Sequence, residues 1–245
     1  MDGTFQGMSQ KLVYDGLQRC PYLPGRVARM PLYRQLSRLT LDETDDRFAD
    51  AERRVGGCLY KTACPTCTAC EGLRVPVATF TPSRSQRRVL RRWAGHSRVE
   101  VGPATYSPEK LALFNRHKTE RDLVSEDDGE MSPLGYVSWL VHSCLHTVEM
   151  RYFYDDALVG VGVVDVGRTS ASSAYFYFDP DRSALSPGVF SAMQEIELCR
   201  RTGRDHLYLG LYVEDCGRLS YKGNYLPNER LVDGDWRPFT KTKGA

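Results

Sequence analysis

Eight cysteines are distributed unevenly along the 245-residue chain. Cys64, Cys67 and Cys70 are each separated by two residues in the segment CPTCTAC, and Cys20 lies far upstream, before Pro21. Thiolates at this spacing along a tight loop can converge on one soft metal centre. Three evenly spaced cysteines with one remote ligand are more typical of a [4Fe–4S] cluster than of paired zinc knuckles. The spacing therefore predicts a metal site, with [4Fe–4S] and Zn²⁺ both open as its occupant and unligated loop thiols as the alternative.

A stripe of arginines follows the cysteines. The window from Gly72 to Val99 holds seven arginines and no acidic residue, whereas the net charge of the whole chain is +2. Five of the seven recur at the spacing of one helical face: Arg84, Arg87, Arg88, Arg91 and Arg92. Like charges at this spacing repel one another, so we expect an anionic partner to offset the repulsion. Guanidinium groups match phosphate geometry, which favours a nucleic acid over the alternative of a solvated basic face.

The segment PSRSQRRVLRRW predicts a helix that positions this stripe, with Ser83 or Ser85 near its N-terminal cap. Val89, Leu90 and Trp93 fall on a different face of the same helix. We therefore expect these three side chains to pack inward while the five arginines point outward.

The C-terminal half contains the pattern of an acyltransferase core. Residues 150–166 predict two strands joined by a turn, and a third strand ASSAYFYFD follows them. Next come the helix GVFSAMQEIELCRR and the strand HLYLGLYV. The order β-β-β-α-β is typical of N-acetyltransferase (GNAT-type) folds. We therefore predict an α/β (α+β) fold with a GNAT-type mixed sheet in residues 99–245, preceded by a small metal-tied module in residues 1–98.

The loop before the predicted helix argues against coenzyme A as a cofactor. Members that use coenzyme A carry a Gln/Arg-x-x-Gly-x-Gly/Ala loop, which binds pyrophosphate at the start of the helix. Here the loop is RSALSPGV, and Pro187 removes one backbone donor. An acyltransferase core without that loop, beside an arginine stripe, favours an acyl donor carried on a nucleic acid, such as aminoacyl-tRNA.

Motifs in both halves resemble the aminoacyl-tRNA–protein transferases. CPYLPGR, CPTCTAC and FTPSRSQRR resemble the N-terminal signature of that family, and YFYFDPD, YLGLYVEDC and SYKGNYLP resemble the C-terminal one. The chain length is similar to that of the bacterial aspartate/glutamate leucyltransferases, which are related to the eukaryotic arginyl-tRNA–protein transferases. The resemblance implies transfer of an amino acid, most simply leucine, from aminoacyl-tRNA to proteins with N-terminal Asp or Glu, which marks them for degradation by the N-degron route. The family cysteines correspond to Cys20, Cys64, Cys67 and Cys70. An arginyltransferase and a non-catalytic, metal-stabilised nucleic-acid-binding protein are the alternatives.

Aminolysis of the tRNA ester needs a proton acceptor for the amine and donors for the oxyanion. We look for both at strand ends and in the loops beside them. Asp165 and Asp179 are candidates to accept the proton or anchor the acceptor ammonium. Tyr175 and Tyr221 are candidates to donate to the oxyanion or the leaving oxygen, and Lys222 or Arg218 to pair with the acceptor's acidic side chain.

The composition is that of a globular protein, with 41% hydrophobic and 26% charged residues. It excludes a disordered or collagen-like chain. No apolar run approaches the length of a membrane span, and the first residues lack an apolar signal core. We therefore expect a cytoplasmic protein with no membrane partner.

Overall fold

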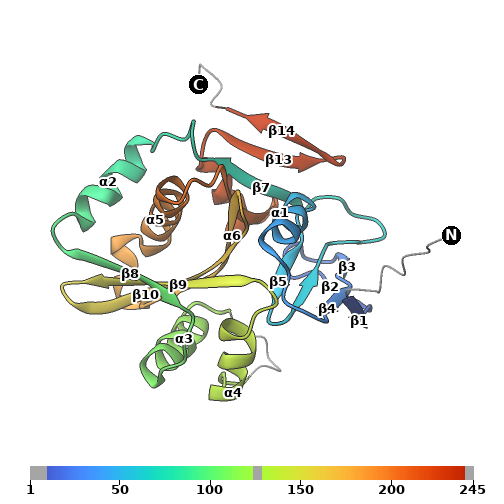
Figure 1. Ribbon diagram of the computed structural model, residues 1–245, viewed down its shortest axis with the longest axis horizontal. Helices are drawn as coiled ribbons and strands as arrows, with labels where there is room; N and C mark the ends of the chain where they lie inside the picture. The colour runs from blue at the N-terminus through green and yellow to red at the C-terminus, as the bar shows by residue number, and fades with distance from the viewer. Residues whose placement is uncertain (1–9, 124–128, 241–245) are drawn as a thin grey trace.

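A computed structural model of the chain describes residues 10–123 and 129–240 (Figure 1). An eight-stranded mixed sheet forms its centre, with the strand order β14-β13-β7-β12-β11-β10-β9-β8. Its strands are β7 (Glu71–Pro76), β8 (Ser97–Pro103), β9 (His146–Tyr154), β10 (Ala157–Val166), β11 (Ser170–Phe178), β12 (His206–Tyr212), β13 (Asn228–Val232) and β14 (Asp235–Phe239).

The predicted β-β-β-α-β order is confirmed by β9, β10, β11, helix α5 (Pro187–Arg201) and β12. The turn between β9 and β10 is made by Asp155 and Asp156, both with positive φ, as a tight hairpin turn requires. Strands β11 and β12 are parallel, whereas β10 pairs antiparallel with both β9 and β11. The fold is therefore mixed α/β with the GNAT-type sheet that the sequence predicts.

Helices cover both faces of this sheet (Figure 1). Helices α2 (Arg84–Trp93) and α5 lie on one face, where Trp93 stacks on Phe190 with ring centroids 3.9 Å apart. The other face carries α3 (Pro108–Glu120), the short helix α4 (Pro133–Tyr136) and the π-helical turn η1 (Val137–Val141). A second hydrophobic cluster around Phe114 fills the space beneath them.

Short elements complete the chain. The N-terminal part contains a four-stranded sheet of β1 (Gln10–Tyr14), β4 (Leu32–Gln35), β6 (Cys58–Tyr60) and β5 (Arg53–Val55), the hairpin of β2 (Leu17–Arg19) and β3 (Val27–Arg29), and helix α1 (Leu41–Ala49). The cavity described below is bordered by η2 (Pro180–Leu185), α6 (Gly217–Ser220) and η3 (Tyr221–Asn224). No helix of the described residues is long and apolar enough to cross a membrane.

Strand β7 joins the two parts of the chain. It directly follows Cys70, and it pairs antiparallel with β12 on one side and with β13 on the other. The division into two domains at residue 98 stays a prediction. The structure adds that β7 and α2, from before this boundary, pack into the large sheet.

Candidate active site

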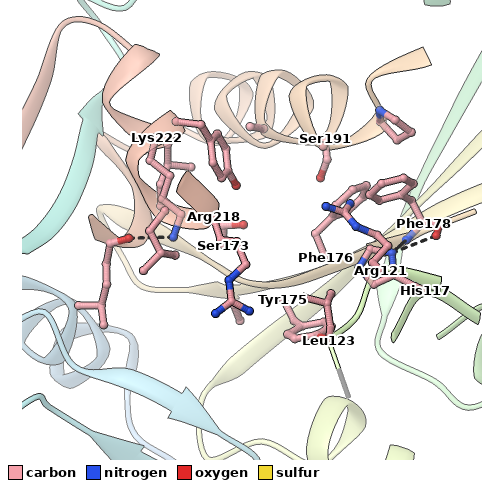
Figure 2. Close-up of a pocket in the computed structure, with 18 of the residues that line it drawn as sticks. His117, Arg121, Leu123, Ser173, Tyr175, Phe176, Phe178, Ser191, Arg218 and Lys222 are labelled. Atoms are coloured by element: carbon pink, nitrogen blue, oxygen red, sulfur yellow. Dashed lines mark hydrogen bonds between the residues drawn. The ribbon is translucent and has the colours of Figure 1, made fainter. Parts of the chain in front are cut away.

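A cavity of about 1160 Å³ opens where the parallel strands β11 and β12 diverge. These strands are paired only from Ser170 to Ser172. Beyond this point β11 contains a bulge at Ala174, which bends it away from its neighbour. The cavity is walled by β11, the start of α5, η3 and the end of α3, and the side chains labelled in Figure 2 surround its open centre.

Arg53 from β5 occupies the base of the divergence. Its guanidinium donates to Ser172 Oγ at 2.9 Å and to the Ser173 carbonyl at 2.9 Å. Gly210 on β12 makes room for this group, since its φ is +86° and a Cβ there would lie 2.8 Å from Arg53 Cζ. The arginine therefore satisfies backbone groups that the ladder no longer pairs, and it places a positive charge in the cavity wall.

Cationic side chains predominate over acidic ones in the cavity wall. The cationic residues are Arg53, Lys118, Arg121, Arg218 and Lys222, and the acidic ones are Glu120 and Glu195. Lys222 Nζ donates to the Leu211 carbonyl at 2.9 Å, and burial, with Arg53 nearby, lowers the pKa of Lys222 to about 7. Arg218 donates to the Pro21 carbonyl at 2.7 Å, which fixes the segment after Cys20 beside the cavity. The excess of cations favours an anionic ligand.

Three of the five predicted catalytic residues, Tyr175, Tyr221 and Lys222, line this cavity. Tyr175 packs against Trp139, with ring centroids 5.1 Å apart. Burial raises the pKa of Tyr175 to about 12, so its hydroxyl keeps its proton and can donate a hydrogen bond.

The structure does not bring Asp165 and Asp179 into the cavity lining. Asp165 is 1% exposed, and it accepts hydrogen bonds from Arg54 Nε at 2.7 Å and from Thr147 Oγ1 at 2.5 Å. Asp179 caps the N-terminus of η2, where it accepts from the Asp181 N–H and pairs with Arg116 at 3.2 Å. Both carboxylates already have partners, so their placement argues against a role as proton acceptor. Asp165 instead ties β10 to β5 of the N-terminal part.

Glu195 is a cavity residue that the sequence analysis did not single out. It lies on α5 and is 1% exposed, and Ser191 Oγ donates to its Oε1 at 2.9 Å. Burial raises the pKa of Glu195 to about 7, although Ser191, Ser173 and Arg53 favour the charged form. The available signal was helical spacing, because Glu195 is flanked by the apolar residues Ala192 and Cys199 at positions three before and four after it.

The arginine stripe lies on the solvent-facing side of α2, as predicted. Its members Arg84, Arg87, Arg88, Arg91 and Arg92 are all exposed, and none of them has an acidic partner among the residues the structure describes. Val89 and Trp93 are buried, and Ser83 caps the helix in a capping box with Gln86. Arg92 donates to the Ala184 carbonyl in η2, next to Ser183, which lines the cavity. One end of the stripe is therefore adjacent to the cavity rim.

The four cysteines of the predicted metal site are half-buried free thiols. Burial, followed by the neighbouring thiols of Cys64, Cys20, Cys67 and Cys216, raises the pKa of Cys70 to about 12. Within residues 10–123 and 129–240, however, no three side chains of His, Cys, Asp or Glu are arranged to hold a metal ion. The donor chemistry suits a soft metal, whereas the side-chain arrangement is not that of an assembled site, so metal binding stays a prediction.

Two solved structures have a low similarity to the chain. The C-terminal domain of a putative lysylphosphatidylglycerol synthetase from Agrobacterium fabrum is 16% identical, with a TM-score of 0.45 over 59% of this chain and 47% of that chain. L-PGS from Bacillus licheniformis is 13% identical, with a TM-score of 0.46 over 69% of this chain and 58% of that chain.

Sequence comparisons define the family. The family model described as "Arginine-tRNA-protein transferase, N terminus" matches residues 18–88, and that for the C terminus matches residues 109–232. An aspartate/glutamate leucyltransferase of Aeromonas hydrophila is 34% identical over 89% of this chain and 91% of its own length. One from Stenotrophomonas maltophilia is 34% identical over 94% of this chain and 93% of its own. The chain therefore belongs to the aminoacyl-tRNA–protein transferases, and it is an enzyme of the aminoacyltransferase class.

Proposed function

We propose that this enzyme transfers leucine from leucyl-tRNA to the α-amine of proteins that begin with Asp or Glu. It acts in the cytoplasm, and the added leucine marks the acceptor for degradation by the N-degron route. The relatives named aspartate/glutamate leucyltransferases support the donor and the acceptor. The observation that carries the acceptor class is the excess of cationic side chains around the cavity, which suits an acidic N-terminal residue.

The tRNA lies along α2 in this proposal. Five exposed guanidinium groups on one helical face, none with an acidic partner among the described residues, can contact successive phosphates of the acceptor stem. Because Arg92 contacts η2 at the cavity rim, a strand that leaves the stripe at this end has a short path into the cavity. The 3′-terminal aminoacyl ester is then presented to the space between β11 and η3.

The acceptor enters with its acidic side chain toward the cationic wall. Lys222 Nζ uses one of its protons for the Leu211 carbonyl, so two remain for a carboxylate. Arg218 and Arg121 add positive charge on the same cavity. The aliphatic side chains of Leu209 and Leu211 offer an apolar surface that fits a leucyl group and gives no partner to a guanidinium.

The reaction itself needs little more than positioning, because the ester is already activated. The amine nitrogen attacks the ester carbonyl carbon and forms a tetrahedral oxyanion. Tyr175 and Tyr221 are the cavity hydroxyls that can donate to this oxygen. The ester C–O bond then breaks, the amide forms, and the ribose oxygen leaves with a proton from the nitrogen.

The cysteines Cys20, Cys64, Cys67 and Cys70 bind a [4Fe–4S] cluster or Zn²⁺ in this proposal, and no coenzyme A takes part. Such a metal stabilises the N-terminal part and the segment that Arg218 holds at Pro21. We expect anaerobically purified protein to contain stoichiometric iron with broad absorption in the blue, or zinc without colour. Cys64→Ser should lose the metal and Cys199→Ala, in the helix core, should keep it; metal-free wild-type protein would overturn the assignment.

A transfer assay tests the function. Purified enzyme is mixed with leucyl-tRNA labelled in the amino acid and with a peptide that begins with Asp. We expect label on this peptide, and none on the same peptide after N-terminal acetylation or with an N-terminal Ala. Arginyl-tRNA serves as the competing donor, and transfer of arginine alone would overturn the choice of leucine. Failure with both donors would overturn the transferase proposal.

A further inference from the structure

Two residues of the cavity wall each have a buried polar atom without a partner among the described residues. These atoms are Glu195 Oε2 and the Tyr225 hydroxyl, on side chains that belong to residues 1% and 2% exposed. Both residues line the cavity. Buried polar groups left without a hydrogen bond destabilise a fold, so an unsatisfied pair within the wall of a cavity points to a ligand that completes it.

The surroundings of Glu195 leave one oxygen free for a ligand. Ser191 Oγ donates to Oε1 at 2.9 Å and lies 3.1 Å from the Tyr152 hydroxyl. Gly162 on β10 provides the space for these groups, since a Cβ there would lie 3.2 Å from the Tyr152 hydroxyl and 3.4 Å from Glu195 Oε1. Oε1 is therefore held toward the sheet, whereas Oε2 makes no hydrogen bond among the described residues, and the Ser173 side chain is the other polar neighbour of this carboxyl. In Figure 2, the Ser191 hydroxyl extends from α5 toward the open centre of the cavity.

We propose that Glu195 is a catalytic residue of this enzyme: its Oε2 binds the α-ammonium of the acceptor and takes its proton. The inference rests on the proposed function. In this arrangement each charge of the acceptor lies beside a cavity group of the opposite charge. The ammonium pairs with Glu195, and the acidic side chain a few bonds away pairs with the cationic wall around Lys222.

The groups that face Glu195 are compatible with this role. Arg53 is the cation among them in the described chain, and its guanidinium is already engaged by Ser172 and Ser173. The others are uncharged or weakly acidic: Ser173, Ser191, Tyr152, Tyr221, Tyr225 and Cys199. Burial brings the pKa of Glu195 to about 7, close to that of an N-terminal amine at about 7.7–8.0, so the proton can pass between them at neutral pH.

The proton balance of the step is complete. One proton of the acceptor ammonium moves to Glu195 Oε2 and from there to water. The neutral nitrogen then forms its bond to the ester carbonyl carbon. A second proton leaves the nitrogen as the ester C–O bond breaks, and it ends on the ribose oxygen.

Glu195→Gln tests the proposal, because glutamine keeps the size and the Ser191 contact but cannot take the proton. We expect kcat for the Asp-starting peptide to fall on the order of 100-fold, with an unchanged KM for leucyl-tRNA. An acceptor whose terminal amine is replaced by an aminooxy group, unprotonated at neutral pH, should restore most of this loss. Glu197→Gln, on the exposed side of the same helix, is the matched control and should behave like wild type.

Two results of this assay would overturn the role. An equal loss with the amine and the aminooxy acceptor would show a structural effect. A raised KM for leucyl-tRNA with kcat retained would place the carboxyl on the ammonium of the donor instead.

A binding measurement separates this inference from the proposed function. In the absence of tRNA, calorimetry should show that wild-type enzyme binds the free Asp-starting peptide at least tenfold more tightly than its N-acetylated form. Glu195→Gln should lose most of this preference, and Glu197→Gln should keep it. Equal binding of both peptides by the wild type would overturn the role of Glu195, whether or not leucine is transferred.

Discussion

Burial of the Glu195 carboxyl predicts a stability difference that depends on pH. Burial raises its pKa from 4.5 to about 7. One unit of pKa corresponds to about 1.36 kcal/mol, so the ionised side chain destabilises the fold by roughly 3 kcal/mol. Between these two pKa values the folded state keeps a proton that the unfolded state has released, so wild-type stability falls as the pH rises through this range. Glu195→Gln lacks this titration. Its unfolding free energy should therefore match that of wild type near pH 4, exceed it by about 1 kcal/mol at pH 5 and exceed it by roughly 3 kcal/mol near pH 8.

Urea unfolding followed by circular dichroism at pH 5, 6 and 8 measures this difference. Glu197→Gln is the control, because its carboxylate is 45% exposed and its variant should differ from wild type by a small, constant amount. A Glu195→Gln difference that is the same at every pH would refute the reasoning, as would a wild type that is the more stable protein at pH 8. A variant that is more stable but less active is the expected result for a residue kept for function.

Three further perturbations address the tRNA, the acceptor and the cavity wall. Changing Arg87 and Arg88 to Ala should weaken tRNA binding and reduce the slope of log affinity against log salt by about 2. Changing Arg200 and Arg201 to Ala, at the C-terminal end of α5, should leave this slope unaltered. Filter binding at several salt concentrations measures both slopes. Since the pKa of Lys222 is lowered to about 7, its charge is lost as the pH rises, and kcat/KM for Asp-starting peptides should fall on the alkaline side. Lys222→Arg should remove that fall, and its persistence in the variant would contradict the assigned pairing. Gly210→Ala should lower the unfolding free energy by more than Gly203→Ala. Both positions have positive φ, but only a Cβ at Gly210 would lie against Arg53, 2.8 Å from its Cζ. Equal losses in urea unfolding would show that Arg53 is not the reason for glycine at position 210.

The elements of the fold could be predicted because their signals are local. The apolar run of β10, the turn at Asp155 and Asp156, and the Ser186–Pro187 start of α5 are each visible within a few residues. The insertion of β7 between β12 and β13 could not be predicted in this way. Its pairing of Val75 with Leu207 joins segments far apart in the sequence, and no short sequence motif shows which strand lies between β12 and β13.

The site could be predicted in part. Motifs led to Tyr175, Tyr221 and Lys222 because residues at strand ends and in adjoining loops reach a cavity between diverging strands. Asp165 has the same kind of position, but Arg54 neutralises it in a contact between distant parts of the chain. Glu195 could not be predicted, because the burial of a carboxyl on a helix depends on which other elements pack over it, and the sequence alone does not show this packing.

Strand β7, from the N-terminal part of the chain, is needed to complete the large sheet, so we expect the two parts to unfold together. It is made before most of the large sheet, yet β12 and β13 meet only through it. A fragment that starts after residue 98 would carry two open strand edges where β7 belongs, and exposed edges of that kind favour aggregation over folding. Because Cys70 immediately precedes this strand, a change in the order of the cysteine-rich segment should also change how firmly β7 is held between β12 and β13. We therefore expect that disorder of the cysteine-rich segment lowers the melting temperature of the large sheet as well.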